Sequence, residues 1–152
     1  MRIPLTVAAI LTAATLDAQE NLGPRDLGLS PEAIRAIYVR LADNASGACW
    51  TNLREVREFA EEKLRNSGYN VVDNIDHARV PDFVFWIGVA AMRDPFETCD
   101  GSISVSVQSM AGVDRFFGVL MLAPPVNEVV SSAGENLNRR VIEAVEEMIS
   151  HM

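Results

Sequence analysis

The chain has few of the residue types that build metal, thiol or phosphate chemistry. Its 152 residues include two cysteines, Cys49 and Cys99, and two histidines, His77 and His151. Two cysteines so far apart with so few histidines make a poor zinc site. Cys49-Trp50 lacks the C-x-x-C spacing of a redox dithiol. The chain contains no glycine-rich phosphate loop and no nucleophile elbow. We therefore expect neither a cofactor nor a catalytic activity.

Basic residues are also in the minority. Thirteen Lys and Arg stand against 21 Asp and Glu, which gives a formal net charge of -8. Nucleic acids and anionic membrane surfaces are bound through clusters of positive charge, so both are poor partners for this chain. The hydrophobic fraction of 49% and the charged fraction of 22% are those of one globular domain.

The N-terminus has the pattern of a secretory signal. Arg2 precedes an apolar run over residues 3–16, and a small residue, Ala18, suits the last position before cleavage. The run is shorter than the roughly 20 residues that span a bilayer core. A buried N-terminal helix is the alternative. We predict a signal peptide over 1–18, a leader over 19–33 and a single domain over 34–152. The mature chain would have no transmembrane segment and would be periplasmic or secreted.

Export from the cytosol would place the two cysteines in an oxidising compartment. An even number of cysteines in an oxidising compartment usually forms disulfides, so we predict a bond between Cys49 and Cys99. Two buried thiols are the alternative.

Hydrophobic periodicity predicts two long helices and five strands. One helix begins at a pair that resembles a capping box, Asn52 with Glu55, with Thr51 as the alternative cap, and ends before Gly68. The second follows another such pair, Ser132 with Glu135. Runs that alternate or are apolar throughout predict strands over about 36–42, 69–73, 82–92, 102–108 and 115–122.

The predicted disulfide restricts the topology. The first helix is a crossover, which makes the first two strands parallel. Cys49 follows the first strand and Cys99 follows the third, so these strands must end on the same side of the sheet. We therefore predict an α/β (α+β) fold, a five-stranded mixed sheet of order 2-1-3-4-5 with both long helices on one face.

A resemblance to a known family can be stated for the first helix and the strand after it. The stretch FAEEKLRNSGYNVVD, residues 59–73, is similar to the helix, its L-R-N-S-G stop and the short strand in the N-terminal α/β domain of TolB-type periplasmic proteins. The resemblance covers about 34–149. It implies the fold and a location in the cell envelope, and it transfers no binding residue, because the shared residues are structural.

Strand parity suggests a binding surface. On the third strand Trp86 has the opposite parity to the bulkier apolar residues, so we expect it on the sheet face away from the helices. Tyr38, Ser104 and Ser106 have the matching parity, and a large aromatic among small residues suits a protein partner. Coverage of this face by the leader is the alternative for Trp86.

Two functions follow from these observations. The first is a non-catalytic binding or assembly module that meets a protein partner in the bacterial envelope. The second is a small-ligand-binding protein or a hydrolase with its site near Asp76 and His77, the one local acid–histidine group.

Overall fold

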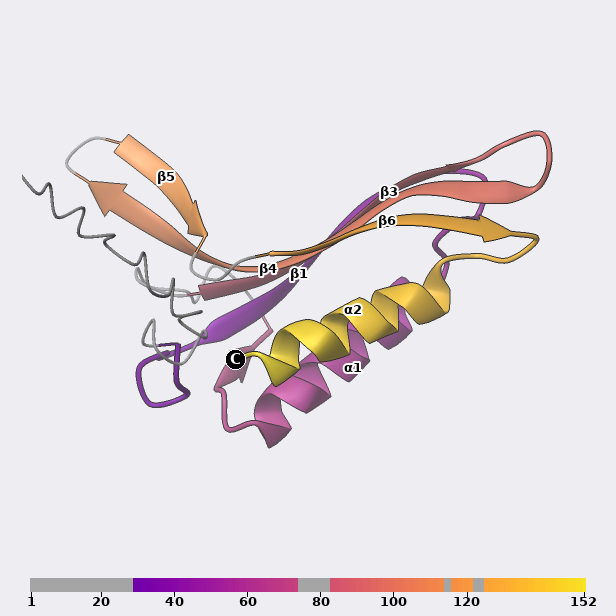
Figure 1. Cartoon of the computed structure of the whole chain (residues 1–152). Coiled ribbons are helices and arrows are strands. Elements are labelled where there is room, and N and C mark those ends of the chain that lie inside the picture. Colours follow the sequence, from indigo (N-terminus) through magenta and orange to yellow (C-terminus); the bar gives the residue numbers. More distant parts are fainter. Residues whose placement is uncertain (1–28, 74–82, 114–115, 122–124) are drawn as a thin grey trace, which may run out of the picture.

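The protein is a curved sheet with two helices packed on one of its faces (Figure 1). The computed structural model describes residues 29–73, 83–113, 116–121 and 125–152. The elements are, in order, β1 (Ile37–Ala45), α1 (Leu53–Asn66), β2 (Val71–Val72), β3 (Phe83–Arg93), β4 (Thr98–Val113), β5 (Phe116–Met121), β6 (Val126–Ala133) and α2 (Asn138–Ser150). The predicted signal peptide, 1–18, lies outside the described residues.

The predicted strand order is confirmed. The sheet runs β2-β1-β3-β4-β5, with β1 parallel to both β2 and β3 and with β4 antiparallel to β3 and β5. The predicted disulfide is confirmed as well, since Cys49 and Cys99 are bonded with their Cα atoms 5.6 Å apart. Both cysteines are fully buried. The bond joins the loop after β1 to the start of β4.

A sixth strand, β6, was missed from the sequence. It pairs antiparallel with β4, from Thr98 opposite Ala133 to Val105 opposite Val126. β5 pairs with the other end of β4, so β5 and β6 follow one another along the edge that β3 leaves free. The predicted capping box at Ser132 is wrong, because Ser132 is a strand residue opposite Cys99 and α2 begins only at Asn138. Pairing with β4 makes this segment a strand, although its local sequence has the pattern of a helix cap.

The first long helix, α1, ends as its sequence predicts. Gly68 has φ +93°, a left-handed conformation that suits glycine. Its N–H donates to Arg65 O at 2.9 Å, and the N–H of Tyr69 donates to Leu64 O at 3.0 Å, which together form a Schellman motif. Leu64 and Tyr69 are both buried, so the residues that end α1 also pack against the core.

The start of α1 differs in detail from a capping box. The Nδ2 of Asn52 donates to a carboxylate oxygen of Glu55 at 3.1 Å, so the predicted pair is present between side chains. The Oδ1 of Asn52 accepts from the indole N–H of Trp50 at 3.0 Å, and no backbone N–H of the helix is capped by it. The pair therefore links the helix start to a buried tryptophan.

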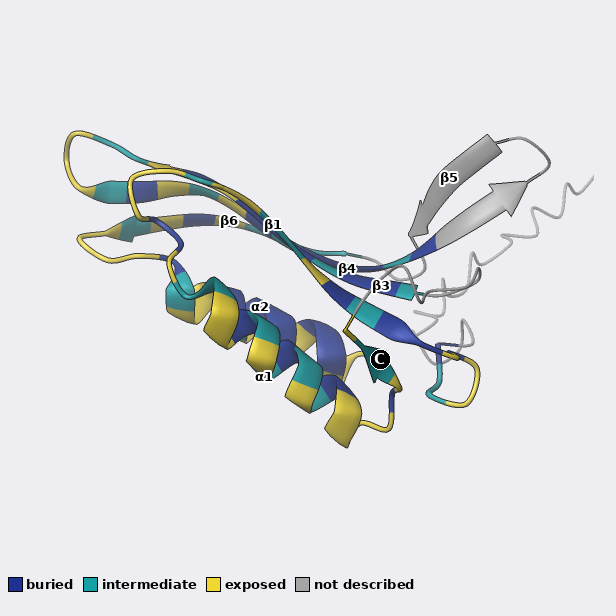
Figure 2. Ribbon diagram, turned by 180° about the vertical axis from the view of Figure 1, so that it is seen from behind, coloured by how far each residue is buried: buried dark blue, intermediate teal, exposed yellow. Residues whose placement is uncertain are grey.

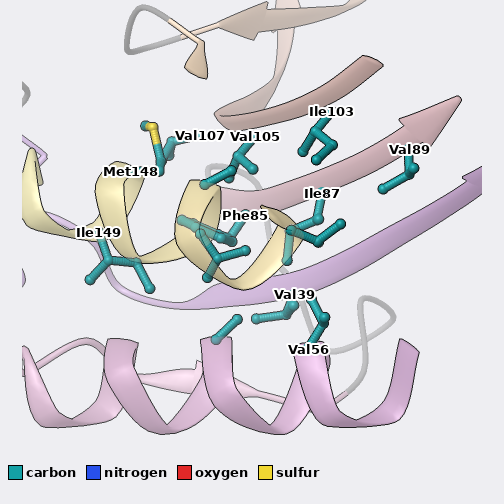
Figure 3. Packing of buried hydrophobic residues seen from close by; sticks show 14 of the residues in the cluster. Val39, Val56, Phe85, Ile87, Val89, Ile103, Val105, Val107, Met148 and Ile149 are labelled. Atoms are coloured by element: carbon teal, nitrogen blue, oxygen red, sulfur yellow. The ribbon is translucent and has the colours of Figure 1, made fainter. Parts of the chain in front are cut away.

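The core fills the space between the helices and one face of the sheet (Figure 3). Figure 2 shows the buried stripes of both helices turned toward the strands and their outer surfaces exposed. The sheet contributes alternate residues, including Val39, Phe85, Ile87, Val105 and Val107. The helices contribute Val56, Ala60, Leu64, Val141, Val145 and Met148.

The described end of the predicted leader packs on this domain. Leu29 is buried in the core, and its carbonyl accepts a hydrogen bond from the Tyr69 hydroxyl at 2.8 Å. The packed structure therefore extends to Leu29, before the predicted boundary at residue 34. The rest of the leader, 19–28, lies outside the described residues.

Candidate functional site

The candidate site is the sheet face away from the helices, which we call the open face. Tyr38, Trp86, Ser104 and Ser106 all lie on it, because each alternates with residues that face the core. In the strand register Trp86 lies opposite Ser106 on β4. Tyr38 and Ser104 lie one row to either side of that pair.

Trp86 lies along its own strand, over Gly88. A Cβ placed on Gly88 would be 2.1 Å from Cη2 of the indole and 2.5 Å from Cζ2. Only a glycine leaves room for the ring there, and the ring in turn buries Gly88. Trp86 is itself half-buried. The side chain of Trp86 is therefore fixed in position against Gly88, and part of it is in contact with solvent.

The neighbours of Trp86 are less accessible than sequence parity suggests. Ser106 is only 1% exposed, and Val84 on the same face is also buried. The Nε2 of Gln108 donates to the Ser106 hydroxyl oxygen at 2.9 Å. Ser106 lies on the expected face but offers little surface, so direct contact of its side chain with a partner is not supported.

The accessible half of the open face lies toward the β3–β4 hairpin. Ala90 and Ser102 are exposed there and lie opposite one another. Met92 and Val129 are 65% and 91% exposed. Sequence reasoning missed Val129 because it missed β6, in which apolar and polar residues do not alternate: Glu128 lies on the helix face and Val129 on the open face.

Ser104 lies at the boundary between the two halves. Its hydroxyl donates to Oδ1 of Asn127 at 2.6 Å. Asn127 is the β6 residue opposite Ser104 and is exposed. This hydrogen bond orients one polar pair on the open face next to the exposed apolar side chains.

The hairpin at the end of this face is tightly organised. The Asp94 carboxylate oxygen Oδ1 accepts the N–H groups of Phe96 and Thr98, each at 2.8 Å. The guanidinium of Arg93 donates to Gly47 O at 2.8 Å and to Glu97 O at 3.0 Å. These bonds hold Phe96 at the tip with 86% of its surface exposed.

The alternative site near Asp76 and His77 falls outside the described residues. Asp73, just before it, is exposed, with its carboxylate 3.8 Å from the guanidinium of Arg65. Within the described parts of the chain, no group of three or more His, Cys, Asp or Glu side chains is placed to hold a metal ion. Over the same residues, neither helix has the length and apolar character needed to cross a membrane.

Compared with models of known protein families and with curated proteins, the sequence matches none.

Proposed function

We propose that the chain is an exported protein of the bacterial cell envelope, periplasmic or secreted, that acts as a non-catalytic binding or assembly module. Its partner would be a protein. The observation that carries the proposal is the open face, where half-buried Trp86 adjoins an exposed surface that contains Met92 and Val129.

Export is supported by the disulfide. Bonds between cysteines persist in oxidising compartments and are rare in the bacterial cytosol. Cys49 and Cys99 are both buried, and the bond ties the loop before α1 to the first residues of β4. The same loop is joined to α2, because the carbonyl of Cys49 accepts the N–H of Leu137 at 2.7 Å. A bond built into the core in this way supports a protein that folds outside the cytosol.

A protein partner is supported by the composition of the open face. The centres of protein interfaces are rich in aromatic residues and methionine and poor in charge. Trp86, Met92 and Val129 lie on this face with the neutral polar residues Ser102 and Ser104. The face also carries two exposed charged residues, Arg40 opposite Trp86 and Asp100 opposite Met92, so its apolar and aromatic side chains, rather than an absence of charge, support a protein partner. Trp86 is already held against Gly88, so little side-chain freedom would be lost when a partner covers it.

The experiment is site-specific photocrosslinking in the native host. A photoreactive amino acid at Ser102, exposed on the open face, should join the chain to a discrete envelope protein. The matched control is the same group at Glu62, exposed on α1 and off that face, where no such product should form. Trp86→Ala should weaken the product from position 102, with urea unfolding used to verify that the variant is folded.

Two results would count against the proposal. Equal crosslinking from Glu62 would mean that the open face has no special role. A product that contains only this chain would mean that position 102 reports self-association rather than a separate partner. The location is tested separately, by fractionating the host cells.

A further inference from the structure

The second edge of β6 is open to pairing. Among the described residues, β6 pairs only with β4. The N–H of Gly134 donates to Glu97 O at 3.1 Å, which sets the phase of the antiparallel pair. Alternate residues bond across such a pair, so the odd-numbered residues of β6 direct their N–H and C=O groups to the outer edge. These are Asn127, Val129, Ser131 and Ala133.

This edge has little of the protection that exposed edges usually carry. Natural edge strands are blocked by lysines, prolines, bulges or inward-pointing charges. β6 is eight residues long, VNEVVSSA, without lysine, arginine or proline. Its one charged residue, Glu128, points inward on the helix face and is the only such protection that β6 carries, and its charge is paired with Arg140 at 2.7 Å. Val129, in the middle of the edge, is 91% exposed.

The helix beside this edge has its charges reversed with respect to its dipole. α2 begins with Arg139 and Arg140 and has Glu146 and Glu147 in its last turns. A helix dipole favours acidic residues at the start and basic residues at the end. The reversed order of charges along α2 therefore lowers the stability of the helix. The same order makes α2 complementary in charge to an antiparallel copy of itself.

We infer that a second copy of this chain pairs with the first along β6, antiparallel, about a two-fold axis near Val129. Each copy would extend the other's sheet, with its helices on the same side. The pairing uses the edge of the sheet and leaves the open face free, so it does not depend on the proposed function.

The spacing of the elements fits this pairing. α2 packs against both β4 and β6. Neighbouring strands are about 4.8 Å apart, so a helix over the boundary of β4 and β6 lies about 5 Å from the two-fold axis. The two copies of α2 would then be about 10 Å apart, at the upper end of the usual distance between packed helices.

The charges on α2 then meet with opposite signs. The ion pair between Arg140 and Glu128 identifies the flank of α2 that faces β6. Glu147 is two helical turns after Arg140, on the same flank, and is exposed. An antiparallel copy brings Arg140, which pairs with Glu128 and Glu143 in its own chain, next to Glu147 of the partner copy, and the symmetry makes this contact twice.

The experiment measures the association of the full chain, purified with its disulfide intact, by sedimentation velocity over a range of concentrations. The wild type should form a dimer. Val129→Pro removes an N–H that β4 does not use and should raise the dissociation constant about 10- to 100-fold, for one hydrogen bond lost in each copy. Glu147→Arg should raise it about tenfold, since it reverses two exposed charge pairs.

Matched variants separate the interface from general effects. Glu62→Arg makes the same charge change on the exposed surface of α1 and should leave the dissociation constant unchanged. Combining Glu147→Arg with Arg140→Glu should recover part of the lost association, because the pair across the axis is remade with its signs exchanged while the ion pairs of Arg140 with Glu128 and Glu143 in its own chain are lost. A wild type that stays monomeric at every concentration would overturn the inference. So would a dimer that Glu147→Arg leaves as strong as the wild type, whether or not Val129→Pro folds.

Discussion

Loss of the Cys49–Cys99 disulfide should lower the stability of the fold by an amount that depends on the length of the loop it closes. The bond joins residues separated by 50 positions. In the chain-entropy model, closing a loop of that length destabilises the unfolded chain, and so stabilises the fold, by about 4 kcal/mol. Replacing both cysteines by alanine removes this constraint. Alanine is preferred to serine, because a hydroxyl at either buried position would add the cost of an unpaired polar group.

The expected loss is therefore about 4 kcal/mol in the free energy of unfolding, measured by urea titration at 25 °C with linear extrapolation. The urea dependence of that free energy should also rise, because an unfolded chain without the cross-link exposes more surface. Wild-type protein that has been reduced should behave like the alanine variant. Oxidised wild type should resist thiol labelling without denaturant.

A loss below about 1 kcal/mol would mean that the disulfide does not stabilise the fold by restricting the unfolded chain, because the chain-entropy model requires several times more for a loop of this length. Labelling of both cysteines in the untreated folded protein would refute it in another way, since the bond would then not form. Comparing the single variant Cys49→Ser with the double alanine variant distinguishes the loss of the bond from the cost of a buried hydroxyl. The single variant breaks the bond and adds a buried hydroxyl, so it should be less stable than the double alanine variant.

Two further predictions concern single glycines, and a third concerns the N-terminus. Gly88→Ala should lower stability by about 1–3 kcal/mol and change the fluorescence of Trp86, because the added methyl overlaps the indole; unchanged fluorescence would mean that the ring does not lie over Gly88. Gly68→Ala should lower the free energy of unfolding, measured in urea, by about 1–2 kcal/mol, because alanine is strained at φ +93°. Gly134→Ala is the matched control for this backbone strain alone, because Gly134 has φ +74° and no atom lies near the position of its added Cβ. Intact mass of protein from its native host should show the loss of residues 1–18, and a full-length mass would contradict the predicted signal peptide.

The elements with local signals could be predicted from the order of the amino acids. The stop at Gly68 depends on a conformation that glycine adopts at little cost, so one residue is enough to end α1. The faces of β1, β3 and the centre of β4 follow from a side-chain period of two, which places Phe85 in the core and Trp86 opposite to it. The strand order could also be predicted, because a bond between Cys49 and Cys99 requires β1 and β3 to end at the same side of the sheet.

Features that depend on contacts between residues distant in the chain could not be predicted in this way. β6 exists because β4 is long enough to offer a second stretch of edge beyond β5, and nothing within Val126–Ala133 reports that length. The same pairing makes Ser132 a strand residue where its local pattern suggested a cap. Parity places Ser106 on the open face, but its burial depends on what packs around it in three dimensions. A side-chain period assigns a face, and exposure on that face is a property of the whole fold.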